Sequence, residues 1–182
     1  GKNFAGEGTP AVTIGAAPAP LVVGSNSFLI VRVPEGAPNG EIVVGKNGSS
    51  ATQNLQVGVR IADGLHPIAN PAVDRRGNIY ATFSGSRGQK TPVSVYRVDA
   101  GTGQSAPFVS DIMNASGLAV DREDVLYVSS RNDGTVYRVS QDGATSVYVE
   151  GMGVATGIVF DAEDNMYVGD RSGTIFKVSR QR

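Results

Sequence analysis

The sequence predicts an all-β protein, part of which is built from repeated four-stranded sheets. Two segments follow nearly the same pattern one after the other: DREDVLYVSSRNDGTVYRVS at 121–140 and DAEDNMYVGDRSGTIFKVS at 161–179. The 24 glycines among 182 residues separate short apolar runs, which is typical of many short strands joined by tight turns. Apolar residues do not recur at the i, i+3, i+4 spacing of an amphipathic helix over any useful length.

A frame of aspartates and tyrosines marks the repeat. An aspartate ends an apolar run in each unit, and a tyrosine follows six residues later; the pairs are Asp74 and Tyr80, Asp121 and Tyr127, and Asp161 and Tyr167. The aspartates lie 47 and then 40 residues apart. Because a period of about 40–50 residues with four strands is typical of a β-propeller blade, we expect blades near residues 66–112, 113–152 and 153–182.

The second unit shows the four strands of the expected blade. Apolar or β-branched runs occupy 117–121, 125–130, 135–140 and 145–151. The hairpin between the second and third runs contains Asp133-Gly134, a strong turn signal because both residues tolerate positive φ, and Asp142-Gly143 marks the next turn. One such sheet cannot bury both of its faces, so the unit has to be repeated.

Three units are too few to close a ring, since closed propellers have about four to eight blades. Residues 57–64, VGVRIADG, stand where an outer strand would precede the first unit. We therefore expect either that the chain is a fragment of a longer protein with further blades, or that two copies form a homodimer that completes a six-bladed ring. The sequence leaves both open.

The motifs GLAVD, LYV and TVYRVS of the second unit resemble NHL-type six-bladed propeller repeats, and more loosely the lactonase-like propellers of the SMP-30 kind. The resemblance covers residues 58–182. In NHL repeats an aspartate usually follows the Tyr-Val pair of the second strand; Asp170 in YVGD keeps it, whereas Ser130 in YVSS departs from the pattern. The resemblance implies an incomplete propeller of about three four-stranded repeats.

Residues 1–57 do not follow the repeat pattern of the rest of the chain. They are similar to the IPT/TIG domain, an immunoglobulin-like β-sandwich. Strand-like runs alternate with Pro/Gly turns there, and PEGAPNGEIVV at 34–44 resembles the family's turn and penultimate strand. The positions that match the family's G-x-N-F and P-x-V-x-I-G motifs are Gly1, Asn3, Phe4, Val12, Ile14 and Gly15. The family's first strand would precede Gly1, so the resemblance implies that this strand is missing from the chain.

Composition excludes several classes of function. The net charge is −1 and the 16 basic residues are scattered, so no basic patch is expected for nucleic acid or for an anionic membrane surface. No run approaches the ~20 apolar residues of a membrane span. The absence of cysteine excludes disulfides, thiolate metal sites and a cysteine nucleophile.

The repeated carboxylates are interpreted as structural. An aspartate at the end of a strand accepts backbone N–H groups of the following turn, which we expect of Asp74, Asp121 and Asp161. The clusters DREDV and DAEDN lack the spacing of a calcium-binding loop. No cofactor is predicted, although a weakly bound divalent cation such as Ca²⁺ stays open.

Lactonase-like propellers hold a divalent metal in the central channel with Glu, Asn and Asp side chains. By that resemblance, Asn114 and Asp170 are the candidates for a channel-facing metal site. The family's Asn-Gly-Leu signature is not met, because Asn114 stands three residues before Gly117 and the third unit, ATGIVFD, has no asparagine. His66 is the sole histidine and lies next to Pro67, so a structural or surface role is favoured over that of a general base.

Four basic residues are the candidates for binding a ligand. Arg87 and Lys90 lie in SGSRGQKTP at 84–92, the insertion that lengthens the first unit, which is either a recognition loop or a long flexible hairpin. Arg131 and Arg171 stand at equivalent positions after YVSS and YVGD. They either line one face for an acidic ligand or pair with neighbouring aspartates.

No catalytic constellation emerges from the sequence, so the expected function is a non-catalytic binding or scaffold role. The propeller surface would be presented to a protein or carbohydrate ligand. The TIG-plus-propeller resemblance implies a bacterial protein that is exported or held at the cell surface, in an extracellular, cell-surface or periplasmic location. The alternative is a metal-dependent lactonase or related hydrolase whose remaining metal ligands lie outside this chain.

Overall fold

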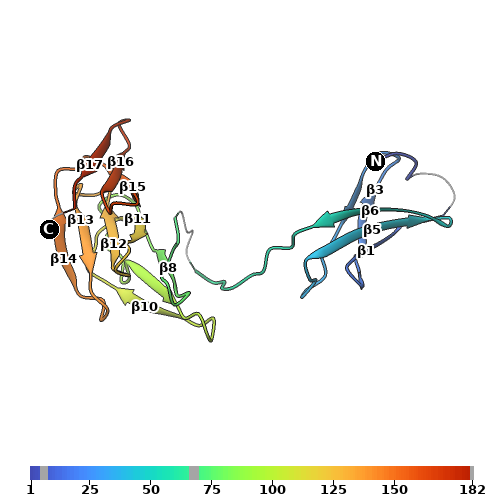
Figure 1. The fold of residues 1–182 in the computed structure, drawn as a ribbon, viewed down its shortest axis with the longest axis horizontal. Coiled ribbons are helices and arrows are strands. Elements are labelled where there is room, and N and C mark those ends of the chain that lie inside the picture. Colours follow the sequence, from blue (N-terminus) through green and yellow to red (C-terminus); the bar gives the residue numbers. More distant parts are fainter. Residues whose placement is uncertain (5–7, 66–69, 181–182) are drawn as a thin grey trace. The chain divides into compact units, whose positions relative to one another are not determined.

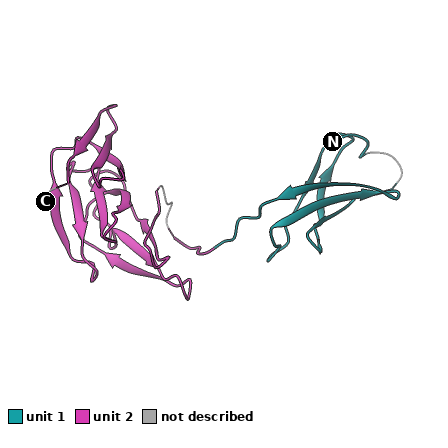
Figure 2. Ribbon diagram, viewed as in Figure 1, with its two compact units in different colours: residues 1–60 teal, residues 61–182 magenta. Residues whose placement is uncertain are grey.

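The computed structural model describes residues 1–4, 8–65 and 70–180 (Figure 1). These residues form strands, turns and loops and include no helix, which confirms the predicted all-β class. It follows that the same ranges hold no helix long and apolar enough to cross a membrane. The chain divides into two compact units, Gly1–Arg60 and Ile61–Arg182, which Figure 2 colours separately.

Unit 1 consists of two small antiparallel sheets. Its strands are β1 (Ala11–Ile14), β2 (Ala17–Pro18), β3 (Leu21–Gly24), β4 (Leu29–Val31), β5 (Gly40–Lys46) and β6 (Ser49–Leu55). The larger sheet has the order β2-β1-β5-β6, and the smaller one pairs β3 with β4. The β5–β6 hairpin turns at Asn47-Gly48, where both residues have positive φ, 49° and 80°, as a tight two-residue turn requires.

Both sheets of unit 1 contribute to one apolar core. Val12 and Ile14 point inward from alternate positions of β1 and are 6% and 1% exposed. Leu29 and Val31 of β4 and Ile42 of β5 pack against them. The short strands are therefore held by a shared interior as well as by their ladders.

Unit 2 contains three antiparallel sheets in sequence order. Its strands are β7 (Ala72–Val73), β8 (Ile79–Thr82), β9 (Val95–Val98), β10 (Ser105–Val109), β11 (Ala115–Val120), β12 (Leu126–Ser130), β13 (Val136–Val139), β14 (Thr145–Val149), β15 (Ala155–Phe160), β16 (Met166–Asp170) and β17 (Ile175–Val178). Sheet 1 is β7–β10, sheet 2 is β11–β14 and sheet 3 is β15–β17. Each pairs strands that are neighbours in the chain, as predicted for propeller blades.

One predicted element is wrong. Residues 57–64 form no strand, although their sequence is rich in valine and isoleucine. In a closed propeller such an outer strand would complete the C-terminal blade, but sheet 3 has only three strands and β17 pairs with β16 alone. A strand-like composition was therefore not sufficient, because no sheet edge of unit 1 or unit 2 pairs with this segment.

One aspartate closes the first turn of every sheet in unit 2 by the same set of hydrogen bonds. In sheet 3, Asp161 Oδ1 accepts the backbone N–H groups of Glu163 at 3.0 Å and Asn165 at 2.8 Å. Its Oδ2 accepts the Tyr167 hydroxyl at 3.0 Å. The aspartates of sheets 1 and 2 accept the corresponding bonds. The prediction that these carboxylates are structural acceptors is confirmed.

In sheet 1 these bonds act on the pKa of both partners. Burial raises the pKa of Tyr80, and the charge of the Asp74 carboxylate that accepts its hydroxyl raises it further. Burial also raises the pKa of Asp74, but the hydrogen bonds from Asn78 and Tyr80 outweigh it and leave that pKa lowered. The carboxylate therefore stays ionised and the tyrosine stays protonated around neutral pH, which keeps acceptor and donor matched.

Contacts between arginine and aspartate tie each turn to the next sheet. Arg75, the residue after the turn aspartate of sheet 1, places its Nε 3.7 Å from Asp124 Oδ1 and donates its backbone N–H to that oxygen at 2.9 Å. Arg122 of sheet 2 makes the equivalent ion pair with Asp164 of sheet 3. Arg180 also binds the Asp164 carboxylate, at 3.1 Å. The three turns are thus joined by ion pairs that run from sheet 1 to sheet 3.

The inner strands of sheets 2 and 3 approach each other through small residues and hydroxyls. A Cβ atom at Gly117 would lie 2.0 Å from Thr156 O, so only glycine fits there. The Ser129 hydroxyl donates to the same oxygen at 2.6 Å and accepts the Gly117 N–H at 2.8 Å. Ser116 donates to Ala155 O at 2.8 Å. Apolar clusters between successive sheets complete the packing of unit 2.

Removing the Tyr127 hydroxyl will destabilise unit 2. Tyr127→Phe leaves Asp121 Oδ2 without its hydroxyl donor, which lies at 3.2 Å. Because this bond goes to a charged acceptor, we expect the free energy of unfolding to fall by about 1–2 kcal/mol. Urea unfolding followed by circular dichroism measures the change.

Tyr148→Phe is the matched control. The two tyrosine rings pack with centroids 5.0 Å apart, but the Tyr148 hydroxyl has no hydrogen-bond partner among the described residues. We expect this variant to keep the stability of the unaltered protein. An equal loss in both variants would contradict the role given to the bond between Tyr127 and Asp121.

Candidate functional site

The predicted binding residues gather at one end of the sheets of unit 2. Alternate loops of an antiparallel meander lie at opposite ends of the sheet. The turn end carries the aspartate turns and the loops after β9 and β13. The loop end carries the hairpins after β8, β12 and β16 and the connections between sheets. The six candidates at the loop end are Arg87, Lys90, Asn114, Arg131, Asp170 and Arg171. The insertion at 84–92 is called the insertion loop below.

Sheet 2 holds the insertion loop of sheet 1 in place. Asn114 is completely buried and accepts the Gly88 N–H at 2.7 Å. Its Nδ2 donates to Gly85 O at 3.1 Å and to Ser86 O at 2.9 Å. Arg131 Nη2 donates to Gly85 O as well, at 2.8 Å. The insertion loop is therefore held in place by sheet 2 and is not a free, flexible hairpin.

Local geometry supports this arrangement. Asn114 has a φ of 51°, in the left-handed region that asparagine tolerates better than most residues. Within the loop, Gln89 Oε1 accepts the Ser86 N–H at 3.0 Å, and the Gln89 N–H donates to Ser86 O at 2.8 Å. Thr91 is buried and its hydroxyl donates to Val93 O at 2.8 Å. The loop is ordered both by its own side chains and by its neighbour.

A cavity of about 480 Å³ lies between the insertion loop and Arg131. Its lining residues are Phe83, Ser84, Gly85, Ser86, Gln89, Lys90, Thr91, Pro92 and Arg131. Ser84 Oγ and Arg131 Nε are buried and have no hydrogen-bond partner among the described residues. An unpaired buried polar atom is costly. Both atoms have almost no accessible surface, so an acceptor oxygen of a ligand would reach them only after a small shift of the cavity wall. The volume lies in the range of small-molecule sites.

Two of the four predicted basic residues, Lys90 and Arg131, line the cavity. Arg87 is exposed on the insertion loop and does not line it. Arg171 matches Arg131 in the backbone, because their N–H groups donate to Val154 O and Asn114 O, each at 3.2 Å, but it lies on sheet 3 outside the cavity. In the described part of the chain, neither Arg131 nor Arg171 forms an ion pair with an aspartate of its hairpin.

Asp170 organises its own hairpin. Its carboxylate accepts the Val154 N–H at 2.6 Å and the Ser172 N–H at 3.2 Å, and it also accepts the Ser172 hydroxyl. The Ser172 hydroxyl is the largest influence on Asp170 and lowers its pKa. The carboxylate thus links the hairpin after β16 to the connection that precedes β15.

The described residues do not fit the channel metal that the lactonase resemblance implies. Across residues 1–4, 8–65 and 70–180, no group of three or more His, Cys, Asp or Glu side chains is arranged to hold a metal ion. The Asn114 amide is engaged by the insertion loop through both its oxygen and its nitrogen. Asp170 is bonded within sheet 3. His66 lies outside the described residues.

Sequence reasoning missed Ser84 and Gln89. The fourth residue after each frame tyrosine is Ser84, Arg131 and Arg171 in turn, so the same alignment that singled out the two arginines also contains Ser84. Gln89 had no such signal, because its contact with Ser86 depends on the folded shape of the loop.

Several solved structures share the fold of this chain, which supports the interpretation of its repeated sheets as β-propeller blades. An auxiliary nutrient binding protein from Bacteroides thetaiotaomicron VPI-5482 matches 95% of this chain and 64% of its own, with 14% identity and a TM-score of 0.53. A putative gluconolactonase matches 78% of this chain and 54% of its own, with 16% identity and a TM-score of 0.50. The nidogen/laminin complex contains a chain that matches 76% of this one and 54% of its own, with 18% identity and a TM-score of 0.51.

This chain therefore spans between 54% and 64% of the length of these structures, and at such identities the likeness concerns the fold alone. No protein-family model matches the chain, and no curated protein matches it.

Releasing the insertion loop from Asn114 will expose it to protease. Asn114→Gly removes three hydrogen bonds and keeps the backbone conformation, because glycine adopts positive φ freely. We expect trypsin to cleave after Arg87 or Lys90 at least about tenfold faster, since local opening becomes easier. Mass spectrometry of timed digests locates and quantifies the cut.

Asn132→Ala serves as the control, because Asn132 is exposed in the neighbouring hairpin and its side chain makes no hydrogen bond within the described residues. Equal cleavage rates for the Asn114 variant and the unaltered protein would show that the loop is ordered without the asparagine.

Proposed function

We propose that this chain is a non-catalytic binding protein that uses the loop end of its propeller blades. The cavity beside the insertion loop supports this proposal. Ser84 Oγ and Arg131 Nε lack an acceptor within the described residues, and Lys90 and Arg131 bring positively charged side chains to the cavity lining. The insertion loop is ordered by Asn114, so the binding surface exists before a ligand arrives, which lowers the entropic cost of binding.

The donors favour a ligand rich in acceptor oxygens, and a carbohydrate, acidic sugars included, meets that requirement. The likeness to a nutrient binding protein from Bacteroides also supports a binding role. It further supports an exported protein in an extracellular, cell-surface or periplasmic location of a bacterium. A protein ligand with acidic side chains is the other class that this surface suits.

Unit 1 is proposed to be an IPT/TIG-type, immunoglobulin-like module. Its two sheets share one core, and two of its motif positions, Asn3 and Gly15, have positive φ of 65° and 57°. Turn residues at fixed positions are what a shared motif would require.

Further blades are proposed to cover the outer faces of unit 2, supplied by a second copy of the chain or by a longer chain. Apolar side chains remain exposed on the first and last sheets. Val73 of sheet 1 is 58% exposed, and Val159 and Ile175 of sheet 3 are 59% and 74% exposed. NHL-type blades bury such faces against one another in a ring.

A metal-dependent lactonase is the second candidate function. The fold likeness to a putative gluconolactonase supports it. In this case the metal ligands would come largely from blades outside this chain, since the described residues do not assemble a ligand set.

Removing the free donors of the cavity will weaken carbohydrate binding. We expect Ser84→Ala and Lys90→Ala each to lower the affinity for bound glycans about fivefold to tenfold, because each removes one donor to the ligand. The Lys90 variant should lose most against acidic sugars. An array of neutral and uronate-containing oligosaccharides identifies the glycans, and titration of the best one measures the affinity.

Arg171→Ala is the control, because Arg171 is exposed on sheet 3 and does not line the cavity. Its affinity should match that of the unaltered protein. Equal losses in all three variants would place the binding surface elsewhere, and binding unaffected by any of them would contradict the role of the cavity.

Lactone hydrolysis separates the two candidate functions. Measured on the complete propeller, with the blades that would supply the missing ligands, the lactonase requires that Ca²⁺, Mn²⁺ or Zn²⁺ raise the rate of gluconolactone hydrolysis above the spontaneous rate, and that a chelator remove the increase. The binding function predicts the spontaneous rate under every condition. Base consumption at constant pH measures the rate directly.

A further inference from the structure

The last strand of sheet 3, β17, has a partner strand on one side only. Among the described residues it pairs with β16 alone, whereas the third strands of sheets 1 and 2, β9 and β13, are paired on both sides. The register between β16 and β17 runs without a shift along the whole strand, Ile175–Val178. The free edge therefore presents regular, unpaired backbone groups that another strand can continue.

The outer edges of sheets 1 and 2 are protected in a way that the edge of β17 is not. In β10 the extra residue of a bulge is Phe108, and it follows Pro107, which has no N–H group to donate. In β14 the extra residue of the corresponding bulge is Tyr148. Bulges and prolines discourage the addition of a further strand, and β17 contains neither.

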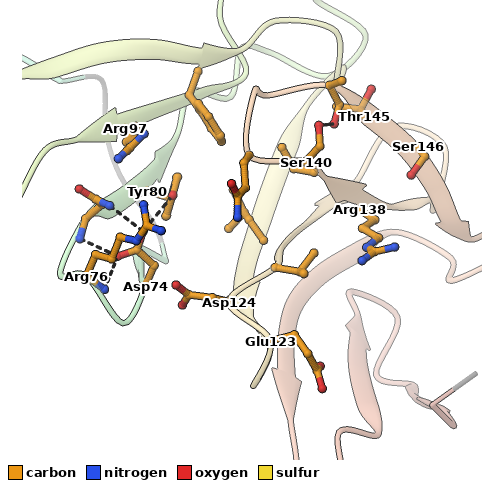
Figure 3. Close-up of a pocket in the computed structure, with 17 residues that line it drawn as sticks. Asp74, Arg76, Tyr80, Arg97, Glu123, Asp124, Arg138, Ser140, Thr145 and Ser146 are labelled. Carbon is orange, nitrogen blue, oxygen red and sulfur yellow. Dashed lines mark hydrogen bonds between the residues drawn. The ribbon is translucent and has the colours of Figure 1, made fainter. Parts of the chain in front are cut away.

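Lys177 is the charged residue of β17, and a lysine often protects the edge of a sheet. It is paired with Tyr167 of β16, and Arg97 of β9 and Arg138 of β13 occupy the same position opposite the frame tyrosines of their sheets. Arg138 nevertheless stands opposite Ser146 of the fourth strand, β14, and both are labelled in the close-up of the pocket between sheets 1 and 2 (Figure 3). A basic residue at this position is therefore compatible with a fourth strand.

The fourth strands of sheets 1 and 2 show what a complete sheet holds at this edge. Each bulge brings an aromatic residue and the valine after it to one apolar cluster; the pairs are Phe108 and Val109 in sheet 1, and Tyr148 and Val149 in sheet 2. The ring of each pair packs on the frame tyrosine of its sheet, with centroids 5.3 Å apart in sheet 1 and 5.0 Å apart in sheet 2.

Sheet 3 has the receiving residues without the pair that covers them. Val95 and Val136, which stand opposite the valines of the two pairs, are 0% exposed. Ile175 occupies the same position in sheet 3 and is 74% exposed. The Tyr167 ring is contacted by Lys177, whose Nζ lies 5.4 Å from its centroid, and by no other ring of the described residues. Tyr167 and Ile175 thus form an open site for an aromatic residue and its neighbour.

We propose that the edge of β17 docks an extended segment of a partner polypeptide that carries an aromatic residue followed by a β-branched one. The segment lies antiparallel to β17 and continues its sheet, as β10 and β14 continue theirs. Its ring packs on Tyr167 and its next side chain covers Ile175. Strand addition of this kind combines main-chain hydrogen bonds with pockets for particular side chains.

A second copy of the chain is a poorer occupant. Segment 57–64 is rich in valine and isoleucine and forms no strand, but it contains no aromatic residue to pack on Tyr167. The proposal rests on the interpretation of sheet 3 as a blade and does not rest on the loop-end cavity. It concerns the edge of sheet 3, whereas the further blades proposed above cover the face.

A peptide with the sequence of residues 144–150, ATSVYVE, is the probe, because it contains the pair of sheet 2. Nitrogen–proton spectra of the full chain follow its titration. We expect saturable binding that shifts the amide signals of β17 and slows their hydrogen exchange at least about tenfold at saturation. A peptide with Tyr148→Ala should bind at least about tenfold more weakly, because it loses the buried ring and its contact with Tyr167.

Substitutions in the protein then separate the edge of sheet 3 from its face. Ile175→Asn removes an apolar side chain from the proposed site, and we expect the peptide to bind at least about fivefold more weakly. Val159→Asn is the matched control, since Val159 is 59% exposed on the same face but lies on β15, two strands from the edge. It should leave the affinity unchanged. Both side chains are largely exposed, so neither substitution removes a buried contact.

Several results would overturn the proposal. Binding that does not saturate, or equal binding of the two peptides, would remove the aromatic pair. Equal affinity of Ile175→Asn and Val159→Asn would place the peptide away from the edge. Signal changes confined to the insertion loop would assign the peptide to the loop-end cavity. Self-association of the unaltered chain that Ile175→Asn abolishes, measured by sedimentation, would make a second copy the occupant. Glycan titrations of the same variants report separately on the loop-end cavity.

Discussion

A carboxylate at the end of each inner strand sets the geometry on which unit 2 depends. The turn that it closes fixes where the second strand starts, because two backbone N–H groups must reach the same oxygen, as they do in Asp161. The tyrosine that it binds lies on that second strand, so the bond also fixes the register between the first two strands. From this register follow the positions of the third-strand basic residues and of the arginines that reach the next sheet. The ties between sheets are consequences of a local hydrogen-bond set.

The two ends of the sheets in unit 2 are held together by different kinds of contact. At the turn end, side chains of the repeat make the contacts, so its sequence is similar in all three units. At the loop end, Asn114 and Arg131 bind backbone atoms of the insertion loop, namely Gly85 O, Ser86 O and Gly88 N–H. Bonds to the backbone leave the side chains of that loop free to differ. A scaffold of this kind separates the residues that maintain the fold from the residues that meet a ligand.

Much of the fold could be predicted from the sequence, because its determinants are local. The frame of aspartate and tyrosine, the Asp-Gly hairpin and the alternation of strand residues each act within a dozen residues, and the four strands of sheet 2 appear where they were expected. The cavity beside the insertion loop depends on contacts between sheets, so it was harder to predict from the sequence. Asn114 touches a loop 26 to 29 residues away, which gives it a role that its neighbours in the sequence do not indicate. The repeated V-Y-R-V pattern was visible in the sequence, but only the folded structure shows that Arg97 faces sheet 2 and Arg138 faces sheet 3.

The ion pairs between successive turns have a direction. The guanidinium comes from the residue after the turn aspartate and reaches forward to the next sheet, and the carboxylate that it meets stands two residues beyond the corresponding position of that sheet. At the backward position sheet 1 has Gly77 instead of a carboxylate, and at the forward position sheet 3 has Ala162 instead of an arginine. The middle sheet is the one that carries both. Exchanging sheets 2 and 3 would leave Asp164 facing Arg75 but would set Ala162 against Asp124, so the Asp124 carboxylate, whose side chain is 24% exposed, would lose its partner. These ion pairs therefore form completely only in the native order of the three similar sheets, and they disfavour an arrangement in which sheets 2 and 3 are exchanged.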